Sequence, residues 1–223
     1  MSRGGGKFAR GALVLTASLA GLLPAGCNIV GPVLYVIEGP PKTPAAYRLQ
    51  NVPTVVFVDD RANIMPRFDL RASIGDEASA VIMKHGGVTT VLSNRDILAL
   101  ARRQDTDKEL MPMDALGRAA GADQLIYVRI VGFALTPDGQ TPRPVAGAEV
   151  RVIDCVARTK AFPSEQNEKG RYVEATLKHA TPDAYGSSGS RRQLEDALAR
   201  KLGDAVAKLF YEYETRELGG NLR

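Results

Sequence analysis

The sequence predicts an α/β (α+β) domain in which a mixed β-sheet is flanked by helices, in the order β-α-β-α-β-β-(β)-α. Residues 53–58 (PTVVFV) form a continuous, largely β-branched run, typical of a strand that is buried on both faces. After this run, segments with the apolar spacing of a helix alternate with segments typical of a strand, as in a sheet covered by helices. After residue 124, strand-like segments follow one another directly, so the sheet is expected to include an antiparallel hairpin.

The first half of the domain should alternate strands and helices. A helix starts at Asp69 and ends at the stop signal His85-Gly86-Gly87. Residues 88–92 are expected to form a second strand. A capping-box pattern over 93–96 starts the second helix, and residues 105–109 are a polar interruption.

The second half should contain the hairpin and the last helix. A short helix is expected over 114–120, and a Pro-Asp-Gly turn lies at 137–139. A Gly/Ser-rich stretch over 181–189 is expected to be a loop, and Ser190 to start the last helix with a second capping box. The expected strands are 124–135, 148–156, 159–162 and 172–177.

The last helix carries a wide apolar stripe, which consists of Leu194, Leu198, Leu202, Val206, Leu209 and Phe210. We expect the stripe to cover one face of the sheet. The alternative is an exposed stripe that binds a partner. The basic residues of this helix, interleaved with acidic ones, indicate a solvated face or, alternatively, a docking face for an acidic partner. They are Arg191, Arg192, Arg200 and Lys201.

The amino-terminal segment has the pattern of a bacterial lipoprotein signal peptide. A basic, acid-free stretch precedes an apolar run over 11–23, which is shorter than the roughly 20 residues needed to span a bilayer. The sequence LPAGC that ends at Cys27 resembles a lipobox, with Ala25 and Gly26 at the small positions and Pro24 where leucine is usual. Cleavage between Gly26 and Cys27 would leave Cys27 to carry the lipid, including palmitate. The alternative is a soluble secretory protein with a chance cysteine.

The chain is therefore divided into four segments. A signal peptide over 1–26 precedes the lipidated cysteine and a Pro-rich tether over 27–50, whose GPPKTPAA stretch favours an extended spacer. A single globular domain is expected over 51–216, followed by a disordered tail over 217–223.

Charge and composition argue against a nucleic-acid-binding protein. Three of the 29 basic residues lie in the signal segment, so the rest of the chain has 26 basic against 25 acidic residues. Tryptophan is absent and aromatic residues make up 6% of the chain, so a base-stacking or carbohydrate-stacking surface is not expected.

Four short motifs resemble the lipoproteins related to the TolB amino-terminal domain. This group includes the curli-secretion lipoprotein and the lipoprotein activators of penicillin-binding proteins. The motifs are VPTVVFVDD, DALGRAAGADQLIYVRI, AEVRVIDCVARTKAFP and LGDAVAKLFYEYE, and they extend over residues 52–214. The resemblance implies the TolB-type fold and an envelope lipoprotein without catalysis that binds protein partners or forms oligomers. The chain lacks the long amphipathic insertions expected of a pore.

The candidate chemistry is sparse. Asp59 and Asp60 follow the first strand, at the edge where open α/β sheets often bind ligands, so they mark a possible ligand or partner loop. The alternative is that both carboxylates only stabilise the loop. Cys155 lies in a strand-like segment and is expected to be a small buried hydrophobe. His85 and His179 lack metal-ligand spacing, so no catalytic residue, metal or cofactor is expected.

The sequence thus predicts a non-catalytic protein-binding or assembly component of the cell envelope. It would be held at the membrane by the lipid on Cys27, with the domain in the periplasm. Asn28 resembles the residue that follows the cysteine in some outer-membrane lipoproteins, so the outer membrane is favoured. Its partner would be another envelope protein or further copies of itself. The alternatives are an accessory lipoprotein of an export or transport apparatus and an enzyme.

Replacement of Cys27 tests the anchor. Cys27→Ser should release the protein from membranes into the soluble periplasmic fraction, because the apolar contribution of the acyl chains, about 0.8 kcal/mol per buried CH₂, is lost. Fractionation and immunoblotting measure this. A variant that stays on carbonate-washed membranes would contradict the lipoprotein interpretation.

Overall fold

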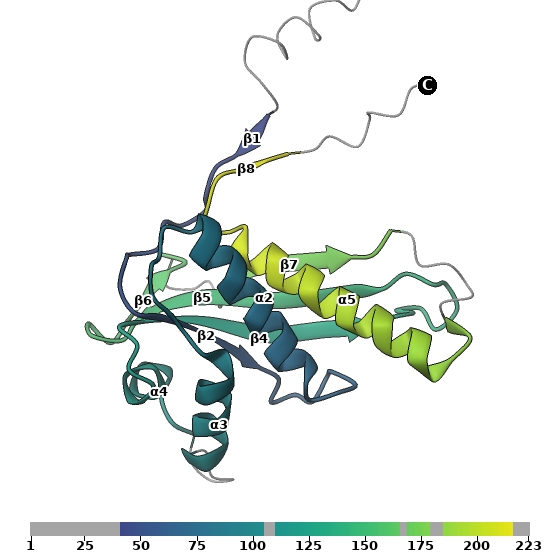
Figure 1. Ribbon diagram of the computed structural model, residues 1–223, viewed down its shortest axis with the longest axis horizontal. Coiled ribbons are helices and arrows are strands. Elements are labelled where there is room, and N and C mark those ends of the chain that lie inside the picture. Colours follow the sequence, from purple (N-terminus) through teal and green to yellow (C-terminus); the bar gives the residue numbers. More distant parts are fainter. Residues whose placement is uncertain (1–40, 105–109, 166–168, 179–184, 216–223) are drawn as a thin grey trace, which may run out of the picture. The chain divides into compact units, whose positions relative to one another are not determined.

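The computed structural model describes residues 41–104, 110–165, 169–178 and 185–215 (Figure 1). The chain divides into two units, and the fold belongs to the unit Thr43–Tyr213. Cys27, the signal segment and the predicted tail over 217–223 lie outside the described residues. Among the described residues, no helix has both the length and the apolar character needed to cross a membrane.

A six-stranded mixed sheet forms the centre of this unit. Its strands run in the order β3-β2-β4-β5-β6, and β7 also pairs with β5. The strand β2 is parallel to β3 and β4, whereas β4–β5, β5–β6 and β5–β7 are antiparallel. The strands are β2 (Thr54–Asp59), β3 (Val91–Leu92), β4 (Gln124–Ala134), β5 (Val145–Asp154), β6 (Thr159–Phe162) and β7 (Arg171–Thr176).

Four helices accompany the sheet in the described part of the unit. They are α2 (Leu70–His85), α3 (Asn94–Gln104), α4 (Met113–Ala119) and α5 (Ser188–Ala207). Two short strands, β1 (Lys42–Thr43) and β8 (Tyr213–Glu214), form a separate two-stranded sheet. This architecture confirms the predicted fold class, a mixed sheet flanked by helices.

The helices lie on both faces of the sheet but cover them unequally (Figure 1). On one face, α2 and α5 run side by side and close a core that extends from β2 to β7. On the other face, α3 and α4 pack mainly on β2 and β4. All six residues of β2 are buried, because this strand lies beneath both layers. The continuous apolar run over 53–58 is the sequence pattern of that position.

The two helices of the larger layer approach each other closely at Gly203 of α5. A Cβ atom there would lie 2.6 Å from the Ile74 carbonyl oxygen and 2.8 Å from Cβ of Glu77, both on α2. Only a residue without a side chain fits at this crossing. At the end of α2, Gly87 has a φ of 74°, a conformation that glycine adopts without strain, so the predicted helix stop is confirmed.

The centre of the apolar stripe of the last helix is buried, as expected, whereas Leu194 and Leu209 are half-buried. Leu198, Leu202 and Val206 are fully inaccessible to solvent and pack in the larger core. The helix itself ends at Ala207, and Phe210 reaches the same core from the turn that follows. The alternative of a stripe exposed for a partner is therefore wrong.

The structure differs from the sequence prediction at several places; β5, for example, begins at Val145 and not at residue 148. Ser190 does not cap α5, because Ser187 does so and accepts a hydrogen bond from the Ser190 N–H at 3.0 Å. Only Ser190 has a glutamine three residues later, but a serine can cap a helix without that partner, and the helix begins directly after Ser187. The second strand is only Val91–Leu92. Finally, Leu49, assigned to the tether, is buried in the larger core, against which Tyr47 also packs.

The buried stripe predicts a clear stability effect. Leu202→Ala should lower the free energy of unfolding by about 2–5 kcal/mol, because it leaves a cavity in the middle of the core. This is a large share of the roughly 5–15 kcal/mol typical of a domain. Thermal denaturation measures the effect. Arg192→Ala, at an exposed position of α5, is the control and should barely change Tm; equal melting of both variants would contradict the packing described.

Candidate functional site

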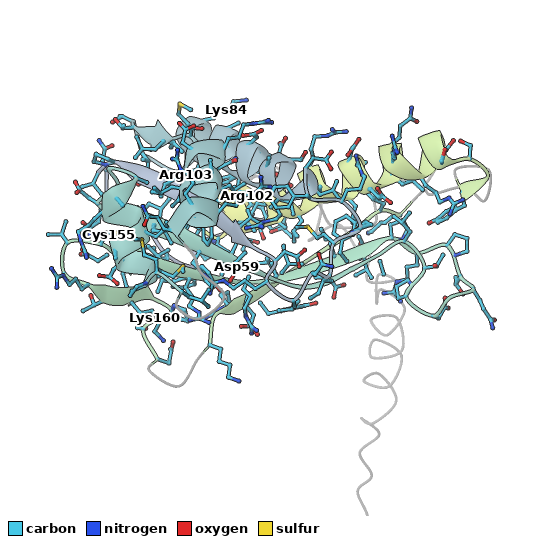
Figure 2. The ribbon with its side chains drawn as sticks, turned by 90° about the horizontal axis from the view of Figure 1, so that it is seen from below. Asp59, Lys84, Arg102, Arg103, Cys155 and Lys160 are labelled. Atoms are coloured by element: carbon cyan, nitrogen blue, oxygen red, sulfur yellow. The ribbon has the colours of Figure 1, made fainter. Side chains whose placement is uncertain are left out.

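The predicted loop of Asp59 and Asp60 lies at the carboxyl end of β2 (Figure 2). Asp59 is 3% exposed, and its carboxylate accepts a hydrogen bond from the Tyr127 hydroxyl at 2.5 Å and one from the Arg61 N–H at 3.1 Å. The Asp60 carboxylate accepts the N–H groups of Ile64 at 2.8 Å and Met65 at 3.0 Å. Both side chains therefore hold the turn that leads towards α2.

The contact between Asp59 and Tyr127 suits a structural role. Burial raises the pKa of Tyr127 above its ordinary value, and the hydrogen bond to Asp59 raises it further. The phenol therefore stays protonated near neutral pH and acts as the donor. Arg61 lies 3.5 Å from the same carboxylate and balances its charge.

No other carboxylate of the described residues joins Asp59 and Asp60 in a metal site. Asp154 accepts the N–H groups of Val156 and Ala157, and Glu149 forms an ion pair with Arg129 at 2.6 Å. Across the part of the chain that the structure describes, no group of three histidine, cysteine, aspartate or glutamate side chains could hold a metal ion. A ligand or partner role for Asp59 and Asp60 stays a prediction.

Cys155 is buried beneath the short helix α4 (Figure 2). A Cβ atom at Gly117 of this helix would overlap its Sγ atom, so the thiol fills space that only glycine leaves open. The guanidinium of Arg118 donates to the Cys155 carbonyl oxygen at 2.7 Å and fixes α4 to the end of β5. Burial raises the pKa of the thiol to about 11. Its interpretation as a small buried hydrophobe is confirmed.

His85 does not form a site with this thiol. The ring of His85 stacks on Tyr211, with their ring centroids 5.0 Å apart, at the end of α2. His179 lies outside the described residues.

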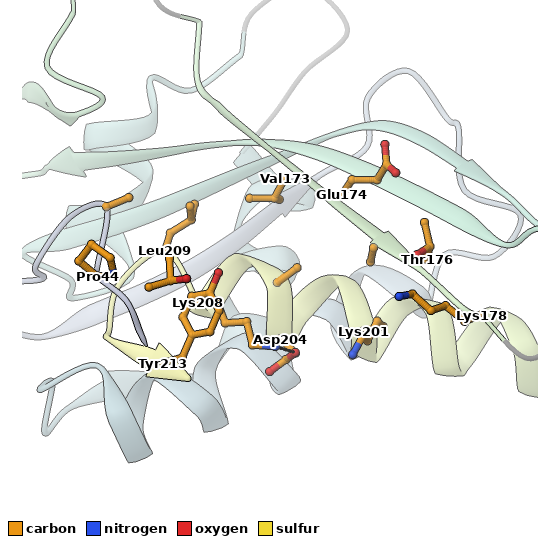
Figure 3. Close-up of a pocket in the computed structure, with 14 residues that line it drawn as sticks. Pro44, Val173, Glu174, Thr176, Lys178, Lys201, Asp204, Lys208, Leu209 and Tyr213 are labelled. Carbon is orange, nitrogen blue, oxygen red and sulfur yellow. Dashed lines mark hydrogen bonds and ion pairs between the residues drawn. The ribbon is translucent and has the colours of Figure 1, made fainter. Parts of the chain in front are cut away.

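The sequence alone did not reveal a groove of about 420 Å³ between β7 and α5 (Figure 3). Four consecutive residues of β7, Val173 to Thr176, line it. Successive side chains of a strand point to opposite faces, so a run of consecutive lining residues means that the edge of β7 borders the groove. The other lining residues are Thr43, Pro44, Ala46, Lys178, Lys201, Asp204, Ala205, Lys208, Leu209 and Tyr213.

The groove is basic at one end and apolar at the other. Figure 3 shows Lys178 and Lys201 together at one end, and Pro44, Leu209 and Tyr213 at the opposite end. Neither of these two lysines has an ion-pair partner among the residues that the structure describes.

Among the other charged lining residues, Lys208 and Asp204 neutralise each other, whereas the carboxylate of Glu174 is only hydrogen-bonded. Lys208 forms an ion pair with Asp204 at 2.8 Å and lies over the Tyr213 ring. Glu174 accepts a hydrogen bond from the Tyr172 hydroxyl at 3.1 Å. The free positive charge is therefore concentrated at Lys178 and Lys201.

No protein-family model matches the chain, and no curated protein sequence matches it significantly. Its fold is similar to that of the PelC dodecamer from Paraburkholderia phytofirmans, with 12% identity over 77% of this chain and 96% of that chain and a TM-score of 0.39. Lipoprotein GNA1162 from Neisseria meningitidis gives 11% identity, 69% and 97% coverage and a TM-score of 0.38. The LpoB C-terminal domain from Salmonella enterica gives 10% identity, 67% and 93% coverage and a TM-score of 0.33.

One of these proteins is itself named as a lipoprotein. At such identities and TM-scores, the likeness carries no information on the function of this chain.

The environment of Cys155 predicts an unreactive thiol. Because its pKa is about 11 instead of the ordinary 9.0, the Cys155 thiol at pH 8 is present as thiolate at about one hundredth of the fraction found in an exposed cysteine. In the full chain with Cys27→Ser, where Cys155 is the only cysteine, Ellman's reagent should therefore react at least about a hundredfold more slowly in buffer than in denaturant. Rapid reaction of the folded protein would contradict this burial.

The same pKa predicts the pH dependence of stability. The folded state favours the protonated thiol, so this contribution is complete below about pH 9 and declines as pH rises towards 11. Urea titrations at pH 8 and 10.5 measure the free energy of unfolding. Between these two pH values, the Cys155→Ala variant should lose less of this free energy than the protein with Cys155.

Proposed function

We propose that this chain is a lipid-anchored protein of the bacterial cell envelope that binds another protein through the groove between β7 and α5. It has no catalytic role in this proposal. The groove is the observation that carries the proposal, and the lipobox-like sequence before Cys27 supports the location. The outer membrane is the favoured membrane, with the unit Thr43–Tyr213 in the periplasm.

The open edge of the sheet supports a protein as the ligand. In a β-strand, alternate N–H and C=O groups point to each edge, and those of β7 that point away from β5 have no strand partner in the described part of the unit. Such an edge presents a row of donors and acceptors spaced as in another polypeptide backbone. A small molecule would match only a few of them.

The polar residues that could have suggested an enzyme are used within the fold. Asp59 and Asp60 accept hydrogen bonds from Tyr127 and from backbone N–H groups. Burial keeps the thiol of Cys155 protonated, whereas a nucleophile must be a thiolate. These contacts support a binding protein over an enzyme.

Site-specific photocrosslinking in cells tests the proposal. A photoreactive phenylalanine analogue in place of Glu174, an exposed lining residue, should form an adduct with one envelope protein. The matched control is the same analogue in place of Lys84, which is exposed on α2 and outside the groove. Mass spectrometry of the adduct would identify a component of wall synthesis or of an export apparatus.

Two results would contradict the proposed function. One is the absence of any adduct from position 174, and the other is the same set of adducts from both positions. If the adduct from position 174 is lost after Cys27→Ser, the lipid anchor is needed to bring the protein close to its partner.

A further inference from the structure

The outer edge of β7 is the part of the sheet best placed to accept another strand. Two strands share the adjacent edge of β5: β6 pairs with its last residues, Val152 to Asp154, and β7 with Val145 to Val150. β7 is therefore an edge strand six residues long, about the usual length of a strand. A proline in β7 would block strand addition because it lacks an N–H group, and the sequence of β7 contains none.

The groove provides space for the side chains of such a strand. Lys201, Asp204 and Ala205 of α5 and Lys208, just after its end, lie within two turns of one another and line the groove beside β7. The volume of about 420 Å³ is within the roughly 300–1,000 Å³ of typical ligand clefts. An added strand would place every second side chain towards α5 and the others towards solvent.

The charge distribution selects the chemistry of that strand. Lys178 and Lys201, without ion-pair partners in the described residues, lie at the end of the groove where β7 finishes. Leu209, Pro44 and Tyr213 form the apolar opposite end. A complementary segment is acidic at one end and apolar at the other. Antiparallel pairing, the more stable arrangement, puts the amino-terminal end of the segment beside Lys178.

We propose that the groove binds an extended segment of its partner protein, with acidic residues first and alternating apolar residues after them, by adding it antiparallel to β7. This proposal rests on the proposed function and specifies the kind of partner surface that the groove recognises. The backbone pairing supplies affinity, and the two lysines together with the apolar end supply direction and specificity.

A synthetic peptide tests the recognition directly. The probe is acetyl-Asp-Glu-Val-Thr-Val-Thr-Val-amide, added to the full chain with Cys27→Ser. We expect saturable binding and slower hydrogen exchange at the β7 amides that do not pair with β5. Alternate N-methylation of the peptide removes the donors that face β7, so it should weaken binding at least about tenfold.

Charge reversal tests the role of the two lysines. Lys178→Glu combined with Lys201→Glu should weaken binding of the acidic peptide at least about tenfold, because attraction becomes repulsion. The matched control combines Lys84→Glu with Arg103→Glu, two exposed positions outside the groove (Figure 2), and should leave the affinity unchanged. Circular dichroism verifies that both double variants are folded.

Several outcomes would overturn the inference. They are no binding of the acidic peptide, equal binding of its N-methylated form, equal weakening by the control variant, and binding without protection of β7. Sedimentation that shows β7-dependent dimers would assign the edge to a second copy instead. If position 174 crosslinks a partner but the peptide does not bind, the proposed function stands and this inference fails. If the peptide binds but no partner crosslinks, the proposed function fails.

Discussion

The burial of β2 on both faces is the constraint on which the rest of the unit depends. Val56 and Val58 lie in one core and Val55 and Phe57 in the other, so this strand is stable only when helices cover the sheet from both sides. That requirement places α2 directly after the strand and α3 after the next strand. It also buries the strand's end, where the Val58 carbonyl oxygen accepts a hydrogen bond from Arg71 at 3.0 Å.

The helix layers on the two faces of the sheet differ in extent. Helices cover both faces at β2, but only one face at β7 and along most of β5. Beyond β4, side chains rather than helices shield the face opposite α5. Arg151 lies over the Tyr127 ring, and Tyr172 packs where Gly147 leaves room for it. Val131, at the irregularity in β4 itself, is 37% exposed. The polar end of β2 is thus locked into the fold, whereas the β7 side keeps an accessible edge.

Local patterns in the sequence predicted the elements well and the site poorly. The β-branched run of β2, the stripe of α5 and the stop at Gly87 are each set by neighbours in the chain, so spacing alone indicates them. The cap of α5 was misplaced because Ser190 fits the capping-box pattern with Gln193, whereas the actual cap, Ser187, lacks that partner. Leu49 was assigned to a tether because its burial depends on residues far away in the sequence.

The groove could not be found in the same way. It requires Thr43, β7 and α5 to meet, and no spacing within one segment encodes such a meeting. The mixed charge of the last helix did suggest a docking face for an acidic partner, and Lys201 is the residue that connects that alternative to the groove. Asp59 and Asp60 attracted attention because they follow a strand, but their hydrogen bonds to Tyr127 and to the loop backbone were not visible in the sequence.

An accessible sheet edge also exposes a protein to aggregation, since the edges of two copies can join into a continuous sheet. In β7 the edge begins at Arg171, and Lys178 follows two residues after its end at Thr176. If two such edges met antiparallel, the cation at each end would approach the cation at the opposite end of the other copy. Repulsion then opposes self-association, while a chain of different charge can still approach. Arg171 and Lys178 would therefore oppose the edge-to-edge association of two copies while leaving the edge accessible to an acidic segment.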